Sequence, residues 1–253
     1  MKRIVVAALL ASSLGAAELK PQTVEAFDRY IRQTEQRLDG QKGFLWADES
    51  ADRARRVRQG EIVVQRFAST PEADVPGGLA HDWVGSVFIP GVTLVKTLSA
   101  MQDYNHKEAY RPEVMASRIL VRSGNDFVVY MRLLKKKVIT VVLDTEHDIH
   151  YFQVGPGRWR SISRTTKIAQ VEKLGKPDEY DLPPGTGDGF LWKLNTYWRF
   201  AERDGGTWVE CEAISLTRDV PLGLGWIIKP IIRDLPKESL ENTLRQTRDA
   251  LSK

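Results

Sequence analysis

The sequence predicts an α+β fold in which a curved antiparallel sheet of about six to seven strands wraps around a long C-terminal helix. Two observations lead to this prediction. Between residues 78 and 218 the chain is a succession of strand-like segments, and short glycine-rich turns between them force antiparallel hairpins. One helical segment, 221–251, then closes the chain, apolar at its start and amphipathic afterwards. Such a sheet can leave a cavity between itself and the helix.

Composition and the first residues indicate an exported globular protein. With 42% hydrophobic and 28% charged residues, the 253-residue chain is large enough for one sizeable core. Lys2 and Arg3 precede the apolar stretch 4–14 and a small-residue site ending at Ala17, which is the pattern of a secretory signal peptide cleaved after Ala17. The alternative is an uncleaved anchor, but about 11 apolar residues fall short of the roughly 20 that span a bilayer. We expect a periplasmic or secreted protein.

Charge and cysteine content exclude several classes of partner. Removing residues 1–17 takes away Lys2 and Arg3, so the net charge falls from +4 to +2, which is too little and too dispersed for a nucleic-acid partner. Cys211 is the only cysteine, so the chain has no intrachain disulfide and no Cys-x-x-Cys zinc site. We expect no cofactor and no metal. The basic run 135–137 is interpreted as a solvated turn, the alternative being contact with anionic head groups at a membrane surface.

The order of segments divides the chain into three parts. After the signal peptide, residues 18–77 form a small N-terminal helical appendage and linker, with helices at 23–40 and 51–59, a strand at 61–67 and a loop at 68–78. Residues 78–253 form the main domain, with a helix at 92–104. Its strands are predicted at 79–89, 115–122, 127–134, 138–152, 158–171, 190–203 and 208–218. Segment 173–189 is either a lid or a loop.

Alternation within the strands predicts which side chains face inward. In 138–152 most even positions are polar, whereas apolar residues stand at five odd positions, as expected of a half-buried strand: Ile139, Val141, Leu143, Ile149 and Tyr151. Two further inward faces follow by alternation, one bulky and one small: Phe190, Trp192, Leu194, Trp198 and Phe200; and Val209, Cys211, Ala213 and Ser215. A wall that pairs bulky with small side chains can enclose space, although a filled core is the alternative.

The closing segment has two halves. Residues 223–232 are apolar nearly all round, and their glycines and Pro230 predict an irregular helix that starts afresh at Pro236. Leu240, Leu244 and Leu251 recur on one face of the second half, which we expect to lie across the sheet. Segment 226–232 is interpreted either as a gate or as a plain buried contact.

Several runs resemble one known superfamily. They are Ala80-His-Asp-Trp-Val-Gly, the strand-helix unit 87–104, Tyr110-Arg-Pro-Glu-Val, the strand through Trp208-Val-Glu-Cys-Glu-Ala, and the closing helix. In this order they resemble the START-related, Bet v 1-like helix-grip (SRPBCC) superfamily, and more narrowly its exported bacterial polyketide-cyclase and lipid-transfer-like members. The resemblance covers about residues 78–251 and lies in element order rather than in one motif. It implies an apolar tunnel that binds lipids, sterols or polyketides, and no catalytic residue carries over.

Histidines supply the first candidates for chemistry. His147 stands on the otherwise apolar face of its strand, where a neutral imidazole could bond a ligand or move a proton, although a satisfied core histidine is the commoner outcome. His81 and Asp82 are adjacent and so point to opposite faces, which argues against a dyad. His106 is expected to be solvated.

Two other polar groups share strand faces. Glu146, Asp148 and His150 could form a weak metal patch on an open face. Arg158, Arg160 and Arg164 are expected on the solvent side, the alternative being an arginine that holds an acidic head group inside the cavity.

The sequence therefore predicts binding, and possible transport, of a hydrophobic small molecule between the sheet and the C-terminal helix. The first alternative is a cyclase, dehydratase or hydrolase-like enzyme that uses His147 in the same cavity. The second is a protein-interaction module with a filled core. The side chains expected to line the space are Trp83, Val141, Leu143, His147, Trp192, Trp198, Phe200, Trp226 and Leu244.

Overall fold

The computed structural model describes residues 19–41, 43–67, 73–136, 140–187, 190–218 and 225–253, and of residues 73–74, 108 and 225–233 it describes the backbone alone. The α-helices are α1 Pro21–Gly40, α2 Ala51–Arg58, α3 Leu94–Gln102 and α4 Gly225–Leu251, with short 3-10 helices η1 Trp46–Glu49 and η2 Glu108–Tyr110. The strands are β1 Val63–Arg66, β2 Ala73–Val75, β3 Gly78–Pro90, β4 Val114–Ser123, β5 Asp126–Lys136, β6 Thr140–Gly155, β7 Arg158–Glu172, β8 Tyr180–Asp181, β9 Leu191–Arg203 and β10 Gly206–Arg218. The proposed cleavage site after Ala17 lies outside the described residues.

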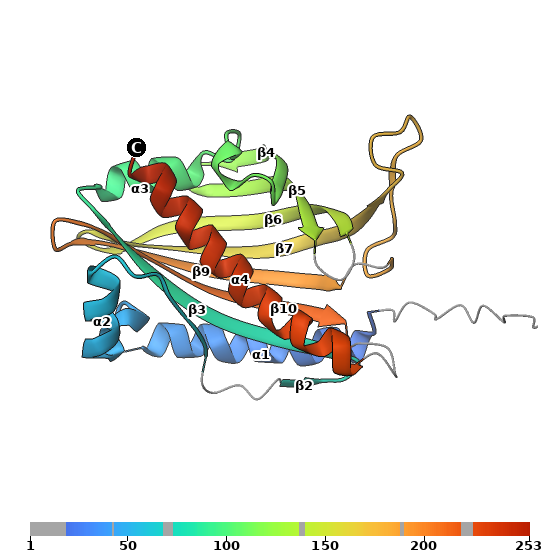
Figure 1. Cartoon of the computed structure of the whole chain (residues 1–253), viewed down its shortest axis with the longest axis horizontal. Coiled ribbons are helices and arrows are strands. Elements are labelled where there is room, and N and C mark those ends of the chain that lie inside the picture. Colours follow the sequence, from blue (N-terminus) through green and yellow to red (C-terminus); the bar gives the residue numbers. More distant parts are fainter. Residues whose placement is uncertain (1–18, 42, 68–72, 137–139, 188–189, 219–224) are drawn as a thin grey trace, which may run out of the picture.

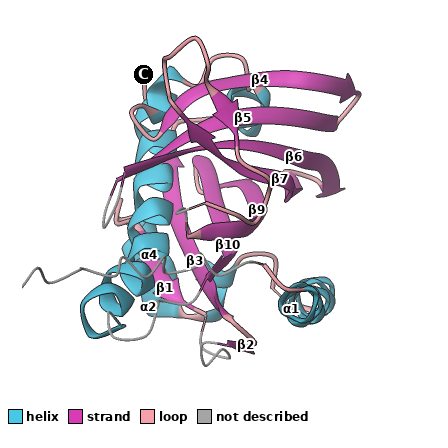
Figure 2. Ribbon diagram, turned by 90° about the vertical axis from the view of Figure 1, so that its right-hand side faces the viewer, coloured by secondary structure: helices cyan, strands magenta, loops and turns pink. Residues whose placement is uncertain are grey.

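One antiparallel sheet carries the fold, in the order β1-β3-β10-β9-β7-β6-β5-β4, with β2 paired to β3 and β8 paired to β7. Helix α4 runs diagonally across one face of this sheet (Figure 1). Seen from the side, the sheet curves around α4, and α1 lies on the opposite face (Figure 2). This arrangement confirms the predicted helix-grip fold, and all seven strands predicted for the main domain are present.

The N-terminal region is less separate than its sequence suggests. Strands β1 and β2 both pair with β3, so these two parts of the region 18–77, expected as an appendage and linker, extend the main sheet. The predicted helices of this region are present as α1 and α2. None of the helices in the described part of the chain is both long enough and apolar enough to cross a membrane.

Local sequence explains the tight connections. The β9–β10 hairpin turns at Asp204 and Gly205, whose φ values of 58° and 75° are those of a type I′ turn and match the twist of the strands. Thr93 is the N-cap residue of helix α3, and its hydroxyl accepts a hydrogen bond from the Lys96 N–H.

Helix α4 is continuous, contrary to the fresh start predicted at Pro236. The backbone is helical from Gly225 to Leu251, through Pro230 and Pro236. A proline inside a helix costs about 3 kcal/mol, but burial of the apolar face of the second half supplies more, because helix stability in proteins comes mainly from tertiary packing. The side chains of segment 226–232, the gate candidate, lie outside the described part.

A glycine lets α4 approach the sheet closely at one end. A Cβ built on Gly85 of β3 would lie 2.7 Å from a Leu244 methyl group of α4 and 2.9 Å from a Val64 methyl group of β1. Any larger residue at position 85 would force the Leu244 and Val64 side chains to move. Leu244 itself is fully buried.

Helix α1 covers the outer face of the sheet. Its apolar residues Phe27, Ile31 and Leu38 are buried and pack against a cluster of sheet residues. The buried sheet members of this cluster are Val75, Ala80, Trp192, Tyr197, Ile214 and Leu216. The amphipathic spacing read from the sequence thus predicts which face of α1 is buried, but not where it packs.

Beneath α1 and η1 lies a layer of buried charge. The Glu210 carboxylate on β10 accepts hydrogen bonds from the backbone N–H groups of Trp46 and Ala47, at 2.8 and 3.0 Å, and pairs with Arg199 of β9 at 2.7 Å. Both charged side chains are almost wholly inaccessible to solvent. Glu212, two residues along, pairs with Arg37 of α1. Because the outer face holds these ion pairs, it depends on α1 to exclude water.

Asp82 in this layer predicts pH-dependent stability. The Tyr30 hydroxyl of α1 donates a hydrogen bond to the buried Asp82 carboxylate. Burial, and to a smaller degree the nearby Glu212 carboxylate, raise the pKa of Asp82 to about 7, against the opposing effects of the Tyr30 hydrogen bond and the Arg37 charge. The folded protein therefore holds a proton that an unfolded chain loses above about pH 4. The stability that Asp82 contributes is full below that pH and falls as the pH rises to about 7.

We expect Asp82→Asn to remove this dependence. Between pH 4.5 and pH 8 the wild type should lose at least about 1 kcal/mol more of its unfolding free energy than the variant does. Urea unfolding at both pH values measures it. Asp39→Asn, at a side chain on α1 that is 82% exposed, serves as the matched control. Parallel pH curves for Asp82→Asn and wild type would contradict the prediction.

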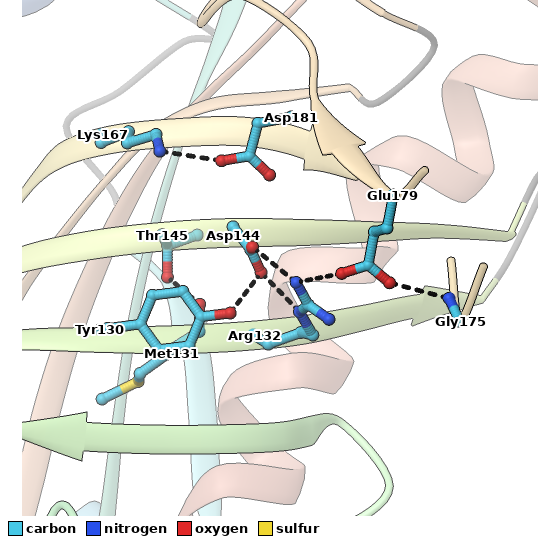
Figure 3. Close-up of polar contacts among 9 residues, drawn as sticks. All are labelled: Tyr130, Met131, Arg132, Asp144, Thr145, Lys167, Gly175, Glu179 and Asp181. Carbon is cyan, nitrogen blue, oxygen red and sulfur yellow. Dashed lines mark hydrogen bonds and ion pairs between the residues drawn. The ribbon is translucent and has the colours of Figure 1, made fainter. Parts of the chain in front are cut away.

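Segment 173–189 is fastened to the outer face rather than lying over the inner one. Arg132 of β5 forms a bidentate pair with Asp144 of β6 at 2.7 and 2.8 Å, and reaches Glu179 of the segment at 2.9 Å (Figure 3). Lys167 of β7 pairs with Asp181 at 2.8 Å. Arg132 and Asp144 alternate with residues that face the helix, so these ties lie on the far side. The described part of the segment is a loop held to the outer face of the sheet by ion pairs, and it is not a lid over the inner face.

Candidate ligand-binding cavity

A cavity lies between the sheet and α4, in two adjoining halves of about 180 and 220 Å³. Protein interiors are packed like organic crystals and contain few voids larger than a water molecule. Two spaces of this size are therefore a property of the fold rather than a packing defect. Six residues line both halves and mark where they adjoin: Lys135, Leu194, Thr196, Trp198, Ser239 and Thr243.

The sequence explains why this region is hollow. On β10 the inward residues are Cys211, Ala213, Ser215 and Thr217, and on β7 they are Ser161 and Ser163. Helix α4 presents one face to them, with Pro236, Ser239, Leu240, Thr243 and Gln246 at helical spacing. Small side chains on the central strands do not reach the helix. The alternative of a filled core is therefore wrong for this end of the domain.

The other end of the same interface is filled. Trp83, Phe200 and Leu244 belong to a packed cluster that also joins α3 and the end of α4. Phe200 is fully buried behind Trp198, and the two rings stack in parallel with centroids 6.2 Å apart. Trp198 thus forms part of the boundary between the packed end and the hollow end.

The predicted lining residues separate accordingly. Val141, Leu143, His147 and Trp198 line the cavity. Trp83, Phe200 and Leu244 are on the predicted inner side, but they are buried in the packed cluster and do not line either half. Trp226 falls in α4, and its side chain lies outside the described part of the chain.

Trp192 is on the outer face, contrary to the prediction. The register pairs Leu216 with Lys193 and Thr217 with Leu191, so Trp192 is the extra residue of a β-bulge. A bulge shifts the alternation of side chains by one position. Leu191 consequently faces the cavity, and Trp192 packs in the cluster under α1. Counting every second residue from Phe190 could not detect this shift.

His147 is neutral, and its tautomer follows from its partner. The Thr145 hydroxyl donates its proton to the Met131 carbonyl at 2.9 Å, so it accepts from Nε2 of His147, also at 2.9 Å. The ring therefore carries its proton on Nε2, which leaves Nδ1 as an acceptor. Burial lowers the pKa of His147 to about 4. In the lining of the second half, this imidazole can accept one hydrogen bond from a ligand.

Tyrosine hydroxyls form a polar end to the second half. Tyr104 and Tyr151 share a hydrogen bond of 2.7 Å, and Tyr110 shares one of 2.8 Å with Thr247 of α4. Burial raises the pKa of each phenol, that of Tyr151 to about 12. All three stay protonated at neutral pH, so this end offers hydroxyl groups rather than phenolates.

Three lysines line the cavity, Lys107, Lys135 and Lys136, and none of them was expected there from the sequence. Lys107 follows α3 and donates to the Ala100 and Met101 carbonyls at 2.9 and 3.1 Å. Lys135 donates to the Ser239 hydroxyl of α4 at 3.3 Å. The interpretation of the basic run as a solvated turn is wrong for Lys135. Alternation along the strand does predict an inward Lys135, because this residue continues the inward-facing series of Met131 and Leu133 on β5.

The remaining polar candidates do not form sites. Among the described residues no group of three or more His, Cys, Asp or Glu side chains could hold a metal ion, which argues against the patch at Glu146, Asp148 and His150. His81 contacts Thr217 at 2.9 Å whereas Asp82 contacts Tyr30 on the other face, so they form no dyad.

The three candidate arginines of β7 lie on the outer face. Arg160 donates to the Leu38 carbonyl, Arg164 pairs with Glu35, and Arg158 lies over the Phe44 ring. None of the three lines either half of the cavity. His106 is exposed and pairs with Asp103 at 3.0 Å, as expected.

Several solved structures are similar to this chain. One is a STAR-related lipid transfer protein from Xanthomonas axonopodis, with 15% identity and a TM-score of 0.46 over 75% of this chain and 99% of that chain. Another is a START superfamily protein from Mycobacterium smegmatis, with 11% identity and a TM-score of 0.44 over 67% and 96%. A third is the Zhui aromatase/cyclase from a Streptomyces species, with 10% identity and a TM-score of 0.47 over 68% and 93%.

All three TM-scores lie below 0.5, so the helix-grip assignment rests on the sheet order and on the position of α4. No family model and no curated protein matches the chain.

Proposed function

We propose that the protein reversibly binds, and serves to carry, a hydrophobic small molecule of lipid-like or polyketide-like character in the cavity under α4. The observation that supports this most is the hollow end of an otherwise packed interface, with walls formed mainly by apolar or small side chains. Burial of apolar ligand surface stabilises a complex by about 25 cal/mol per Å². The few polar groups, above all His147 and the tyrosine hydroxyls, would orient the guest.

Native mass spectrometry of the protein purified from its own host tests the proposal. We expect a co-purifying small molecule, released on denaturation, and displacement of the neutral fluorophore N-phenylnaphthylamine by the extracted material. The same spectrum tests the proposed export, since loss of residues 1–17 gives a defined lower mass. A protein that carries nothing and does not bind the fluorophore would contradict the proposed function.

His147 favours a second candidate, an enzyme that uses the same cavity. An imidazole that keeps its proton on Nε2 has Nδ1 available to accept a proton from a bound substrate. An efficient general base has a pKa near the working pH, whereas the pKa of His147 is about 4, so this imidazole is a weak base at neutral pH. We therefore place binding first.

Replacing His147 by alanine separates the two functions. For a carrier we expect affinity for the extracted ligand to change by less than about tenfold, the equivalent of one hydrogen bond. For an enzyme, turnover of the ligand should fall by at least about 100-fold, the usual contribution of a general base. Mass analysis of the ligand after incubation with each variant measures turnover. Thr145→Val is the matched control, since it removes the partner of Nε2 and keeps the imidazole.

A further inference from the structure

The charged side chains of the cavity are predominantly cationic. Among the described residues that line its two halves, the charged ones are Lys107, Lys135, Lys136 and Glu113. Three ammonium groups and one carboxylate give this apolar space a net positive charge, although the mature chain is close to neutral. A ligand with no charge would gain nothing from this excess.

Only one of these lysines is both enclosed and short of partners. The Lys107 ammonium is held by two carbonyls at the end of α3 and lies over the Tyr104 and Tyr110 rings. Lys136 is exposed. Lys135 has three N–H donors, and the structure gives them one hydrogen bond, to the Ser239 hydroxyl at 3.3 Å.

The surroundings of Lys135 are apolar. In the register of β5 and β6 it lies opposite Val141, and it lines both halves of the cavity, next to Leu143 in one and Leu133 in the other. Burial lowers the pKa of Lys135, while the charge of Glu113 raises it. Glu113 itself accepts a hydrogen bond from Gln246 at 3.2 Å. An ammonium in such surroundings is stabilised when an anion takes its remaining donors.

We propose that the bound molecule is an amphiphile with an anionic head, a carboxylate or a phosphate, that lies against the Lys135 ammonium and the Ser239 hydroxyl. The apolar part of the molecule extends along the small side chains of β10 or toward Met131 and the tyrosine end. This inference rests on the proposed function and makes it specific. It assigns to Lys135 a role that the apolar lining residues do not have, namely discrimination by head-group charge.

Four ligands with the same chain test the inference: dodecanoate, dodecyl phosphate, dodecanol and methyl dodecanoate. With the protein that begins at residue 18 we expect at least one of the two anions to bind about tenfold or more tightly than the alcohol and the ester. A charge-assisted hydrogen bond predicts a difference of this size. Displacement of N-phenylnaphthylamine gives the four affinities. Comparing the two anions shows whether the site binds any anionic head group or prefers a planar carboxylate, and either result supports the inference.

The variant Lys135→Met removes the charge and keeps the length of the side chain. It should lower affinity for the preferred anion about tenfold and leave affinity for dodecanol within about twofold. Lys135→Arg should retain the preference for anions. Lys176→Met, which removes one charge from an exposed loop, controls for net charge.

Failure of the inference and failure of the proposed function give different results. Equal affinity of wild type for anions and alcohol, or an equal loss of both in Lys135→Met, overturns the anionic head while leaving a hydrophobic guest in place. If none of the four ligands displaces the fluorophore and the fluorophore itself does not bind, the proposed function fails. Circular dichroism of each variant establishes that the affinities refer to folded protein.

Discussion

Glu210→Ala is expected to lower the free energy of unfolding by about 3–5 kcal/mol, the range observed when one partner of a buried ion pair is removed. The carboxylate is 1% exposed and is held by the Arg199 guanidinium and by the N–H groups of Trp46 and Ala47. Alanine leaves all these donors without their acceptor. Denaturant unfolding at neutral pH, with the slope of the transition checked against wild type, measures the loss.

A double variant shows whether the loss comes from the unpaired charge. Because Glu210→Leu with Arg199→Met removes both charges, we expect it to regain most of the stability that Glu210→Ala loses. Glu241→Ala on the exposed part of α4 breaks only a surface pair with Arg245 and should cost less than about 1 kcal/mol. If the double variant is as unstable as Glu210→Ala, the two backbone hydrogen bonds at η1 rather than the ion pair hold this layer together.

The outer charged layer and the inner cavity lie on opposite faces of the same strands. On β10, Glu210 and Glu212 point outward while Cys211 and Ala213 line the cavity. A hollow inner face forfeits dispersion contacts that a packed core would have. The ion pairs and the apolar cluster beneath α1 offset part of this loss, and the packed cluster at the far end of α4 offsets more. This division lets the protein keep a space without losing its fold.

The alternation of apolar and polar residues predicts most of the sheet from the sequence. It predicted the seven main strands, the inward phase of β6 with Val141, Leu143 and His147, and the small residues of β10. Alternation is reliable where one face is buried and the register is regular. It failed at Trp192, where a bulge in β9 inverts the phase, because the extra residue is defined only by its pairing with β10.

The charged residues were harder to place. The sequence predicts only that α1 belongs to an appendage, because a single sequence does not show that a helix more than 40 residues away covers the strand face that holds Asp82 and Glu212. Lys135 was misread for a different reason: a run of three lysines suggested solvent, although its phase on β5 pointed inward. Phase on a strand was the better guide than local charge.

The cavity itself gives the largest expected effect on binding. Ala213 lies on the floor of the first half, between Cys211 and Ser215 and beneath α4. Phenylalanine at position 213 should occupy the space that the guest needs, so affinity for the extracted ligand and for N-phenylnaphthylamine should fall by at least about 100-fold. The unfolding free energy should stay level or rise by about 1 kcal/mol, because cavity-filling substitutions commonly stabilise.

The combination of these two results is what distinguishes a container from a packed core. If the space under α4 were filled, the added ring would have no room and the variant would lose about 1–3 kcal/mol by overpacking. Val95→Phe, which adds the same ring to a position of α3 that is 78% exposed, should change neither affinity nor stability and serves as the matched control. Retained affinity in a folded Ala213→Phe protein would place the guest elsewhere and remove the basis for ligand binding under α4.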